Sequence, residues 1–379
     1  MALYSNRFSF VRPVAAMIVL AGCGSPSSVG KSDATVVTVA PATWSGVALD
    51  AIVVGSDVES AHQPAMSAIH LAKQPGTPFG SELSPLAIPY DAGVLYLAAP
   101  QGGGFSGGSL RFAGPDGDRV VDEGAASFAV AADGRIAVGR LTSKGSEIVV
   151  LDGLESRAEA WMSSEQVVVA LAWSGDQLMM LETFGDSGAA PNLLSIASSG
   201  EARIVRSESG LLAVSPDGES LLVDSLDPKT GLNAAVVVDS KTFEQTGELR
   251  LSDSSSELTV GQSEWSNAGV VATVWIDGVQ QVAMFKAEGD DFVMAQAVVL
   301  PKEVQFGLVQ PTLVADSGEV WGWAWDNRVQ PSADGTFSTP PYLLVDCSFT
   351  TSECAIKNVG STSGQVSRVF NRSSHTVEE

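Results

Sequence analysis

Two cysteines near the C-terminal end of the chain have a spacing that suggests a covalent bond. Cys347 and Cys354 lie in the segment 345–356, where apolar residues flank the pair and a turn is expected near Thr350 to Ser352. A hairpin of this kind brings cysteines on facing strands close enough for a disulfide. We predict a disulfide between them, with a free-thiol or metal-binding pair as the alternative.

Two glycine-flanked serines could in principle act as nucleophiles. Ser187 lies in a Gly-Asp-Ser-Gly-Ala segment that resembles the nucleophile turn of trypsin-like proteases, and Ser106 lies in a partly matching Gly-Phe-Ser-Gly-Gly segment. Such a serine needs a histidine base within hydrogen-bond reach. None of the candidates, His62, His70 and His375, lies in the histidine motif of that family. We expect catalysis by neither serine and, with 3 His and 3 Cys in the chain, neither a metal nor a cofactor.

Three tryptophans alternate with small residues late in the chain. Trp321, Trp323 and Trp325 would lie on one face of a strand, because successive side chains of a strand point to opposite faces. Rings in this arrangement pack between sheets or, where exposed, form a stacking platform for a sugar or a peptide. Both roles stay open at this point.

The charge balance excludes one class of partner. The 379 residues contain 21 Lys+Arg and 44 Asp+Glu, which gives a formal net charge of -23. A general nucleic-acid binder needs a basic face to displace counterions from phosphates, so we expect no nucleic-acid partner. The 45% of hydrophobic residues suffices for a large folded core.

The N-terminus is typical of an export signal. Residues 1–22 contain two arginines and no acid, and their apolar run, 14–21, is shorter than the roughly 20 residues that span a bilayer. The run ends in Leu-Ala-Gly-Cys, which resembles the bacterial lipobox. The resemblance implies diacylation of the Cys23 thiol, cleavage after Gly22 and acylation of the new N-terminus. An ordinary signal peptide with an incidental cysteine is the alternative, and 23–35 would be a flexible tether.

A repeated pattern runs through the rest of the chain. Each copy has an apolar strand, a tight turn with glycine and a second apolar strand, as in the segment 212–223. The turn glycines are Gly46, Gly93, Gly134, Gly175, Gly218, Gly269 and Gly318, separated by 47, 41, 41, 43, 51 and 49 residues. Strand-rich periods of this length are typical of propeller blades with four antiparallel strands. We predict an all-β propeller of seven blades, with six or eight as alternatives and a β-sandwich as the competing fold.

Short motifs within the copies point to a known kind of repeat. The Ser-Pro-Asp-Gly turn at 215–218, the Trp-Ser pairs at Trp44, Trp173 and Trp265, and the Val-Val-Asp ending of the expected third strand resemble TolB-like, WD-repeat-like propellers. The resemblance implies the fold and leaves the function open. It covers most of the chain, so we expect the propeller over 36–359. A polar tail would follow at 360–379.

The expected binding site lies on long connections. In a four-stranded blade, the connection between strands two and three lies on one face of the ring. The connection that leads from strand four into the next blade lies on the same face. Four such connections are long: 100–108, 184–192, 227–233 and 326–341. Binding residues are often carried by loops on a rigid scaffold. The last connection follows the tryptophan strand and contains Arg328 and Phe337, so we expect these two residues and the three tryptophans to contribute to binding.

Two function classes follow from this interpretation. The first is a lipid-anchored, extracytoplasmic propeller, at the cell surface or on the periplasmic side of a bacterial membrane, that binds a protein, a peptide or an envelope polymer without catalysis. The second is an extracytoplasmic propeller enzyme such as a glycan hydrolase or lyase. The enzyme would need paired carboxylates or a His or Tyr base near the channel mouth.

Overall fold

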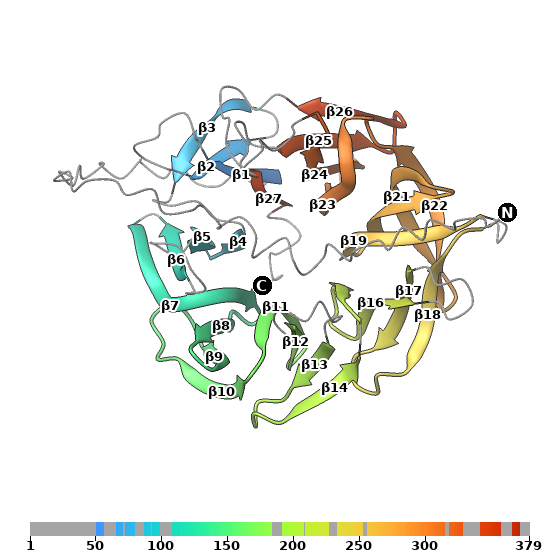
Figure 1. The fold of residues 1–379 in the computed structure, drawn as a ribbon. Coiled ribbons are helices and arrows are strands. Elements are labelled where there is room, and N and C mark those ends of the chain that lie inside the picture. The colour runs from blue at the N-terminus through green and yellow to red at the C-terminus, as the bar shows by residue number, and fades with distance from the viewer. Residues whose placement is uncertain are drawn as a thin grey trace, which may run out of the picture.

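The computed structural model describes the chain from residue 51 to residue 371 with interruptions. The described residues are 51–56, 66–70, 73–79, 87–91, 93–98, 108–114, 116–183, 192–207, 209–226, 233–252, 256–314, 318–328, 342–357 and 366–371. All regular elements among them are β-strands, which are arranged in a ring (Figure 1). The predicted all-β propeller is therefore confirmed.

The described strands form seven runs of four antiparallel neighbours, which we number as blades 1 to 7 along the chain. Blade 1 contains β27 (Val366–Asn371), β1 (Ala51–Ser56), β2 (Met66–His70) and β3 (Lys73–Phe79). Blade 2 contains β4 (Ala87–Tyr90), β5 (Gly93–Ala98), β6 (Gly108–Gly114) and the first half of β7 (Gly117–Val130). Blade 3 contains the second half of β7, β8 (Ile136–Thr142), β9 (Gly145–Leu151) and β10 (Glu159–Ser164).

The remaining blades follow the same pattern. Blade 4 contains β11 (Val167–Ser174), β12 (Gln177–Thr183), β13 (Asn192–Ile196) and β14 (Ala202–Arg206). Blade 5 contains β15 (Leu211–Val214), β16 (Ser220–Leu226), β17 (Asn233–Asp239) and β18 (Gln245–Arg250). Blade 6 contains β19 (Leu258–Ser266), β20 (Gly269–Ile276), β21 (Val279–Glu288) and β22 (Asp291–Val299). Blade 7 contains β23 (Val304–Val314), β24 (Glu319–Asp326), β25 (Tyr342–Ser348) and β26 (Glu353–Lys357).

Two features join neighbouring blades directly. Strand β7 turns at Gly124 (φ 74°), so that its first half pairs with β6 and its second half with β8. The outer strands β18 and β22 pair in parallel through Leu249 with Phe292 and Arg250 with Val293. Blades 5 and 6 consequently share one hydrogen-bonded sheet of eight strands.

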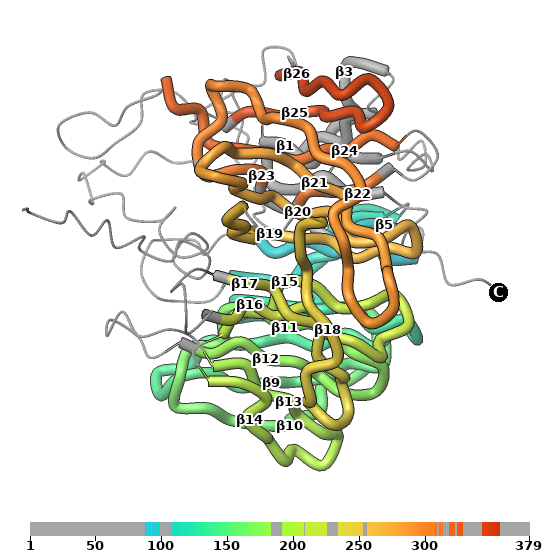
Figure 2. The backbone as a smooth tube through the Cα atoms, turned by 90° about the vertical axis from the view of Figure 1, so that its right-hand side faces the viewer, coloured from blue at the N-terminus to red at the C-terminus, as the bar shows by residue number. Residues whose placement is uncertain are grey.

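The core consists of hydrophobic layers between neighbouring blades, and Figure 2 shows the backbone of the ring from the side. One hydrophobic cluster joins Ile148 of blade 3 to Leu178 of blade 4, and another joins Leu181 of blade 4 to Val236 of blade 5. A third joins Val271 of blade 6 to several residues of blade 7. A strand between two such layers needs apolar side chains on both faces, as in β12, where Leu178 and Met180 belong to one layer and Met179 and Leu181 to the next.

The turn glycines predicted from the repeat keep the expected place in the blades. Gly93, Gly134, Gly175, Gly218, Gly269 and Gly318 each lie at the junction of the first and second strand of a blade, and Gly46 lies outside the described residues. Hydrogen bonds connect equivalent regions of successive blades. The Tyr90 hydroxyl donates to the Gly134 carbonyl (2.9 Å), and the Trp173 indole donates to the Ala129 carbonyl (3.3 Å), each across 44 residues.

The first blade differs from the expectation. The segment 360–379, expected as a polar tail, contains β27, which pairs with β1 and lies toward the centre of the ring (Figure 1). We expected the unit around Gly46 to provide this innermost strand. The place beside β1 is instead filled by β27, which also contacts β23 and β24 and so ties the first blade to the last.

Candidate ligand-binding face

The two faces of the ring differ in the connections that emerge there. Because neighbouring strands are antiparallel, the turns after strands one and three emerge on one face, called here the hairpin face. The connections after strands two and four emerge on the opposite face, called here the loop face. Each of the four long connections links strands two and three, as expected, in blades 2, 4, 5 and 7. Most of their residues lie outside the described part of the chain.

The described start of the longest connection holds an ion pair. Arg328 donates from Nε to Asp326 Oδ1 (2.8 Å) and from Nη2 to Asp326 Oδ2 (2.7 Å), and its backbone N–H donates to the same carboxylate (2.9 Å). The Asp326 side chain is 9% exposed, whereas the Arg328 side chain is 58% exposed. The buried carboxylate thus orients a guanidinium that solvent can reach.

The same interactions set the charge state of both residues. Hydrogen bonds from Arg328 hold the pKa of the Asp326 carboxyl below its usual value, although burial acts in the opposite direction. The pKa of Arg328 is raised, chiefly by its hydrogen bonds to Asp326. Asp326 is therefore ionised at neutral pH and is unsuited to act there as a general acid.

Asn327, between these two residues, anchors the connection to the preceding part of the ring. Its backbone N–H donates to the Glu303 carbonyl (2.8 Å), and its side-chain amide donates to the Lys302 carbonyl. Lys302 and Glu303 belong to the link between blades 6 and 7, just before β23. The base of the loop is thus fixed to the segment that leads into blade 7.

The predicted tryptophan cluster is divided by the structure. Trp321 is 4% exposed, so it packs in the interior and cannot offer an open stacking surface. Trp325 is partly buried. Trp323 lies in β24 opposite Leu344, and its side chain lies outside the described part, as does all of Phe337. Of the expected site residues, the described structure places Arg328 on the accessible loop face.

The cysteine prediction is confirmed. Cys347 in β25 and Cys354 in β26 lie directly opposite each other and form a disulfide. The bond joins the third and fourth strands of blade 7, and Cys347 is buried in the layer between blades 6 and 7. Cys23, Ser106, Ser187, His62 and His375 lie outside the described residues.

A second arginine network near the loop face has no signature in the sequence. Arg140 donates to both carboxylate oxygens of Asp122, from Nε (2.8 Å) and from Nη2 (2.6 Å), and from Nη1 to Glu147 (3.2 Å). These hydrogen bonds raise the pKa of Arg140. Asp122 belongs to blade 2 and the other two residues to blade 3, so the network joins the blades. Periodicity places residues along a strand but does not reveal partners on different strands.

The fold defines a β-propeller protein. No family model and no curated protein matches the chain. A putative TolB from Agrobacterium tumefaciens is similar at 14% identity over 63% of this chain and 83% of its own, with a TM-score of 0.43. An oligogalacturonate lyase in complex with manganese is similar at 11% identity over 73% of this chain and 83% of its own, with a TM-score of 0.49.

The third comparison supports the fold assignment. A prolyl endopeptidase aligns at 11% identity over 82% of this chain and 50% of its own, with a TM-score of 0.51. The chain thus spans half the length of that protein. At this identity the similarity concerns the fold alone, since one scaffold serves unrelated functions. Within the described residues, no helix is long and apolar enough to cross a membrane.

Proposed function

We propose that this protein is a lipid-anchored, extracytoplasmic propeller that binds a protein, a peptide or an envelope polymer through its loop face, without catalysing a reaction. The observation that supports the proposal is the Asp326–Arg328 pair. It presents an oriented, solvent-accessible guanidinium at the base of the longest connection. Arginine in this setting is a frequent interface anchor, because its planar group makes paired hydrogen bonds and stacks on other groups.

The arrangement of the scaffold supports the same proposal. Hydrogen bonds and hydrophobic layers between successive blades stabilise the ring. The connections on the loop face, by contrast, differ in length from blade to blade. A rigid frame that carries variable loops allows recognition of a partner with a small loss of conformational entropy on binding. The charge state of Asp326 argues against its use as an acid catalyst, and Arg328 already occupies both of its carboxylate oxygens, so the pair is better suited to binding.

Crosslinking in intact envelopes tests the proposal. The variants are a replacement of 329–339 by a short Gly-Ser turn, which keeps the anchor at Asn327, and Arg328→Gln. We expect both to lose the species that the parent chain captures, with a nearly unchanged melting temperature. Arg135→Gln is the matched control. Like Arg328, Arg135 lies two residues after the aspartate with which it pairs, here Asp133. Unlike Arg328, it lies on the hairpin face.

Two results would contradict the proposal. Equal capture by the parent and by both loop-face variants would exclude this face as the binding site. Release of shortened polymer fragments by the parent chain, and not by a heat-denatured sample, would indicate the enzyme alternative, a glycan hydrolase or lyase.

A further inference from the structure

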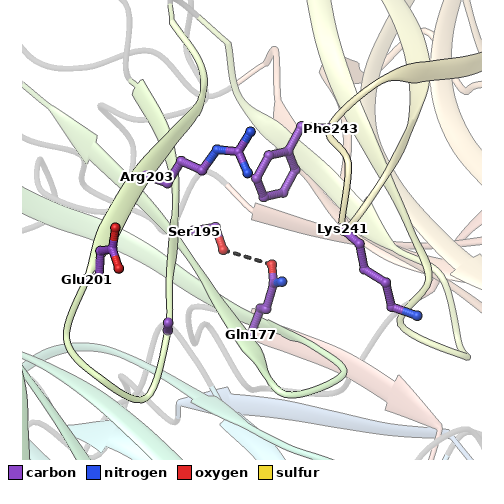
Figure 3. A pocket seen from close by; sticks show the side chains of 7 residues that line it. Gln177, Ser195, Glu201, Arg203, Lys241 and Phe243 are labelled. Atoms are coloured by element: carbon purple, nitrogen blue, oxygen red, sulfur yellow. Dashed lines mark hydrogen bonds between the residues drawn. The ribbon is translucent and has the colours of Figure 1, made fainter.

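A small hollow lies on the hairpin face, where blades 4 and 5 meet. Its volume is about 250 Å³. Its polar and aromatic lining comes from Gln177, Ser195, Glu201 and Arg203 of blade 4 and from Lys241 and Phe243 of blade 5 (Figure 3). The ring places this hollow on the face opposite the long connections.

The blade 4 wall presents an ordered amide. Ser195 and Arg203 are directly opposite each other in β13 and β14, so their side chains share one face of the blade. The buried Ser195 hydroxyl donates to Gln177 Oε1 (2.9 Å). Because the oxygen accepts this bond, the amide nitrogen of Gln177 is turned toward the side of Lys241 (Figure 3).

The blade 5 wall is a turn with a fixed shape. The Asp239 carboxylate accepts from the backbone N–H groups of Lys241 (2.9 Å) and Thr242 (2.7 Å). Phe243 follows with a φ of 63°, an unusual conformation for an aromatic residue. The turn thereby directs the ring of Phe243 toward blade 4, where the Arg203 guanidinium carbon lies 4.9 Å from the ring centroid.

The charges of the lining favour an anion of low charge. Arg203 and Lys241 supply two cations from the two sides of the hollow, and Glu201 stands on the blade 4 side, across from Lys241 (Figure 3). Lys241 Nζ lies 3.7 Å from Glu219 Oε1, but both side chains are largely exposed, so this pair is weak and can open toward a ligand. The net charge of -23 repels anions of high charge.

We propose that this hollow is a second binding site, which takes a monovalent carboxylate attached to a small apolar or planar group. The carboxylate would accept from the Gln177 amide, from Arg203 and from Lys241, and the apolar group would pack against Phe243. The volume is below the roughly 300 Å³ at which pockets for drug-sized ligands begin, so the ligand is smaller. The carboxylate is free in a small acid or terminal in a peptide.

Calorimetric titration of the full chain at constant ionic strength tests this site. Benzoate is the probe, and benzamide is its neutral counterpart. We expect saturable binding of benzoate and at least about tenfold weaker binding of benzamide, because hydrogen bonds to a charged acceptor are the stronger ones. Arg203→Gln and Lys241→Gln should each weaken benzoate binding, the former by about tenfold. A peptide with a free C-terminus, compared with its amide, distinguishes the two sources of carboxylate.

The matched control is Arg135→Gln, since Arg135 also lies over an aromatic ring, that of Trp173, at 4.6 Å from its centroid but outside the hollow. Both this control and the replacement of 329–339 should leave benzoate binding unchanged. A failure of the proposed carboxylate site can therefore be told apart from a failure of the proposed loop-face function. The proposal is overturned if benzamide binds as well as benzoate, if inorganic phosphate binds more tightly than benzoate, or if Arg203→Gln has no effect in a variant that melts like the parent.

Discussion

The Ser174 hydroxyl donates a 2.6 Å hydrogen bond to the carbonyl oxygen of Gly218, across the boundary between blades 4 and 5. The Ser240 hydroxyl, in the turn directly after the third strand of blade 5, donates to the same oxygen (2.9 Å). The glycine that defines the sequence repeat is therefore also a point at which neighbouring blades meet. Its carbonyl accepts a hydrogen bond from each of the two blades, which satisfies a part-buried polar group where they meet.

Gly218→Ala is expected to destabilise the protein strongly. Gly218 has a φ of 70°, and a Cβ atom there would lie 2.4 Å from the backbone nitrogen of Gly175. The conformation costs about 1 kcal/mol for alanine, and the steric conflict adds about 1–3 kcal/mol. Gly278→Ala is the control, since Gly278 has a φ of 81° but nothing within 4 Å of the added atom. Chemical denaturation should show a clearly larger loss at Gly218, and equal losses would contradict the steric argument.

Loss of the disulfide is expected to lower stability without opening the ring. The bond between Cys347 and Cys354 closes a short loop, for which chain entropy predicts a contribution of about 2 kcal/mol. Reduction of the parent chain and the Cys347→Ala, Cys354→Ala double variant should both lower the denaturation midpoint. Reduction serves as the control because it leaves the buried sulfur atoms in place. Mass spectrometry of unreduced protein should find the two peptides linked, and free thiols in exported protein would refute the pairing.

The Asp326–Arg328 pair is expected to stabilise the fold above about pH 4 and to lose its effect in acid. The pKa of Asp326 is lower in the folded chain than in the unfolded chain, so its contribution is fully present above the unfolded pKa of about 3.9. It disappears as the pH falls through the folded pKa. Asp326→Asn should therefore be less stable than the parent at pH 7, by up to about 1 kcal/mol, and should approach it below pH 4.

A control for this pH dependence is Asp176→Asn. Asp176 also contacts an arginine, Arg135 (3.2 Å), but its side chain is fully exposed. We expect almost no stability difference for this variant at any pH, since exposed pairs contribute little. A stability difference for Asp326→Asn that is the same at pH 7 and pH 3 would show that the carboxylate acts through packing and not through its charge.

Cys23→Ser is expected to abolish lipidation. If the Leu-Ala-Gly-Cys segment acts as a lipobox, the parent chain should carry acyl groups at residue 23, visible as a mass increase of the N-terminal peptide. The serine variant should lack that mass and should be recovered unprocessed or released from membranes. Normal maturation and membrane retention of the variant would refute lipid anchoring.

The architecture was predictable because its signals are local. A tight turn needs glycine at Gly134, Gly175 or Gly218, and the flanking apolar strands are continuous in sequence, so the spacing gives the blade directly. The pairing of Cys347 with Cys354 was predictable for the same reason. The role of Trp321 could not be predicted. The alternation of the tryptophans indicates that their side chains share one face of a strand, but it does not indicate what covers that face.

The features that sequence analysis missed depend on distant partners. Val366–Asn371 contains three residues that favour strands, Val366, Val369 and Phe370, but nothing local assigns the segment to β1. The parallel pairing of β18 with β22 depends on how two blades tilt, which no motif records. The hollow between blades 4 and 5 combines Gln177 with Phe243, residues that meet only after two repeats have stacked.

The pairing of β27 with β1 also has a consequence for the order of folding. Blades 2 to 7 each consist of consecutive strands, so each of their sheets needs only its own segment of the chain and packing against its neighbours. Blade 1 must wait for the most distant stretch of the described chain, so its formation is the slowest topological step. Until then β1 exposes an unsatisfied edge, and a strand from a second molecule could occupy it. A chain truncated before Val366 would therefore be prone to strand exchange between molecules, and the last few residues of the ring protect it from self-association.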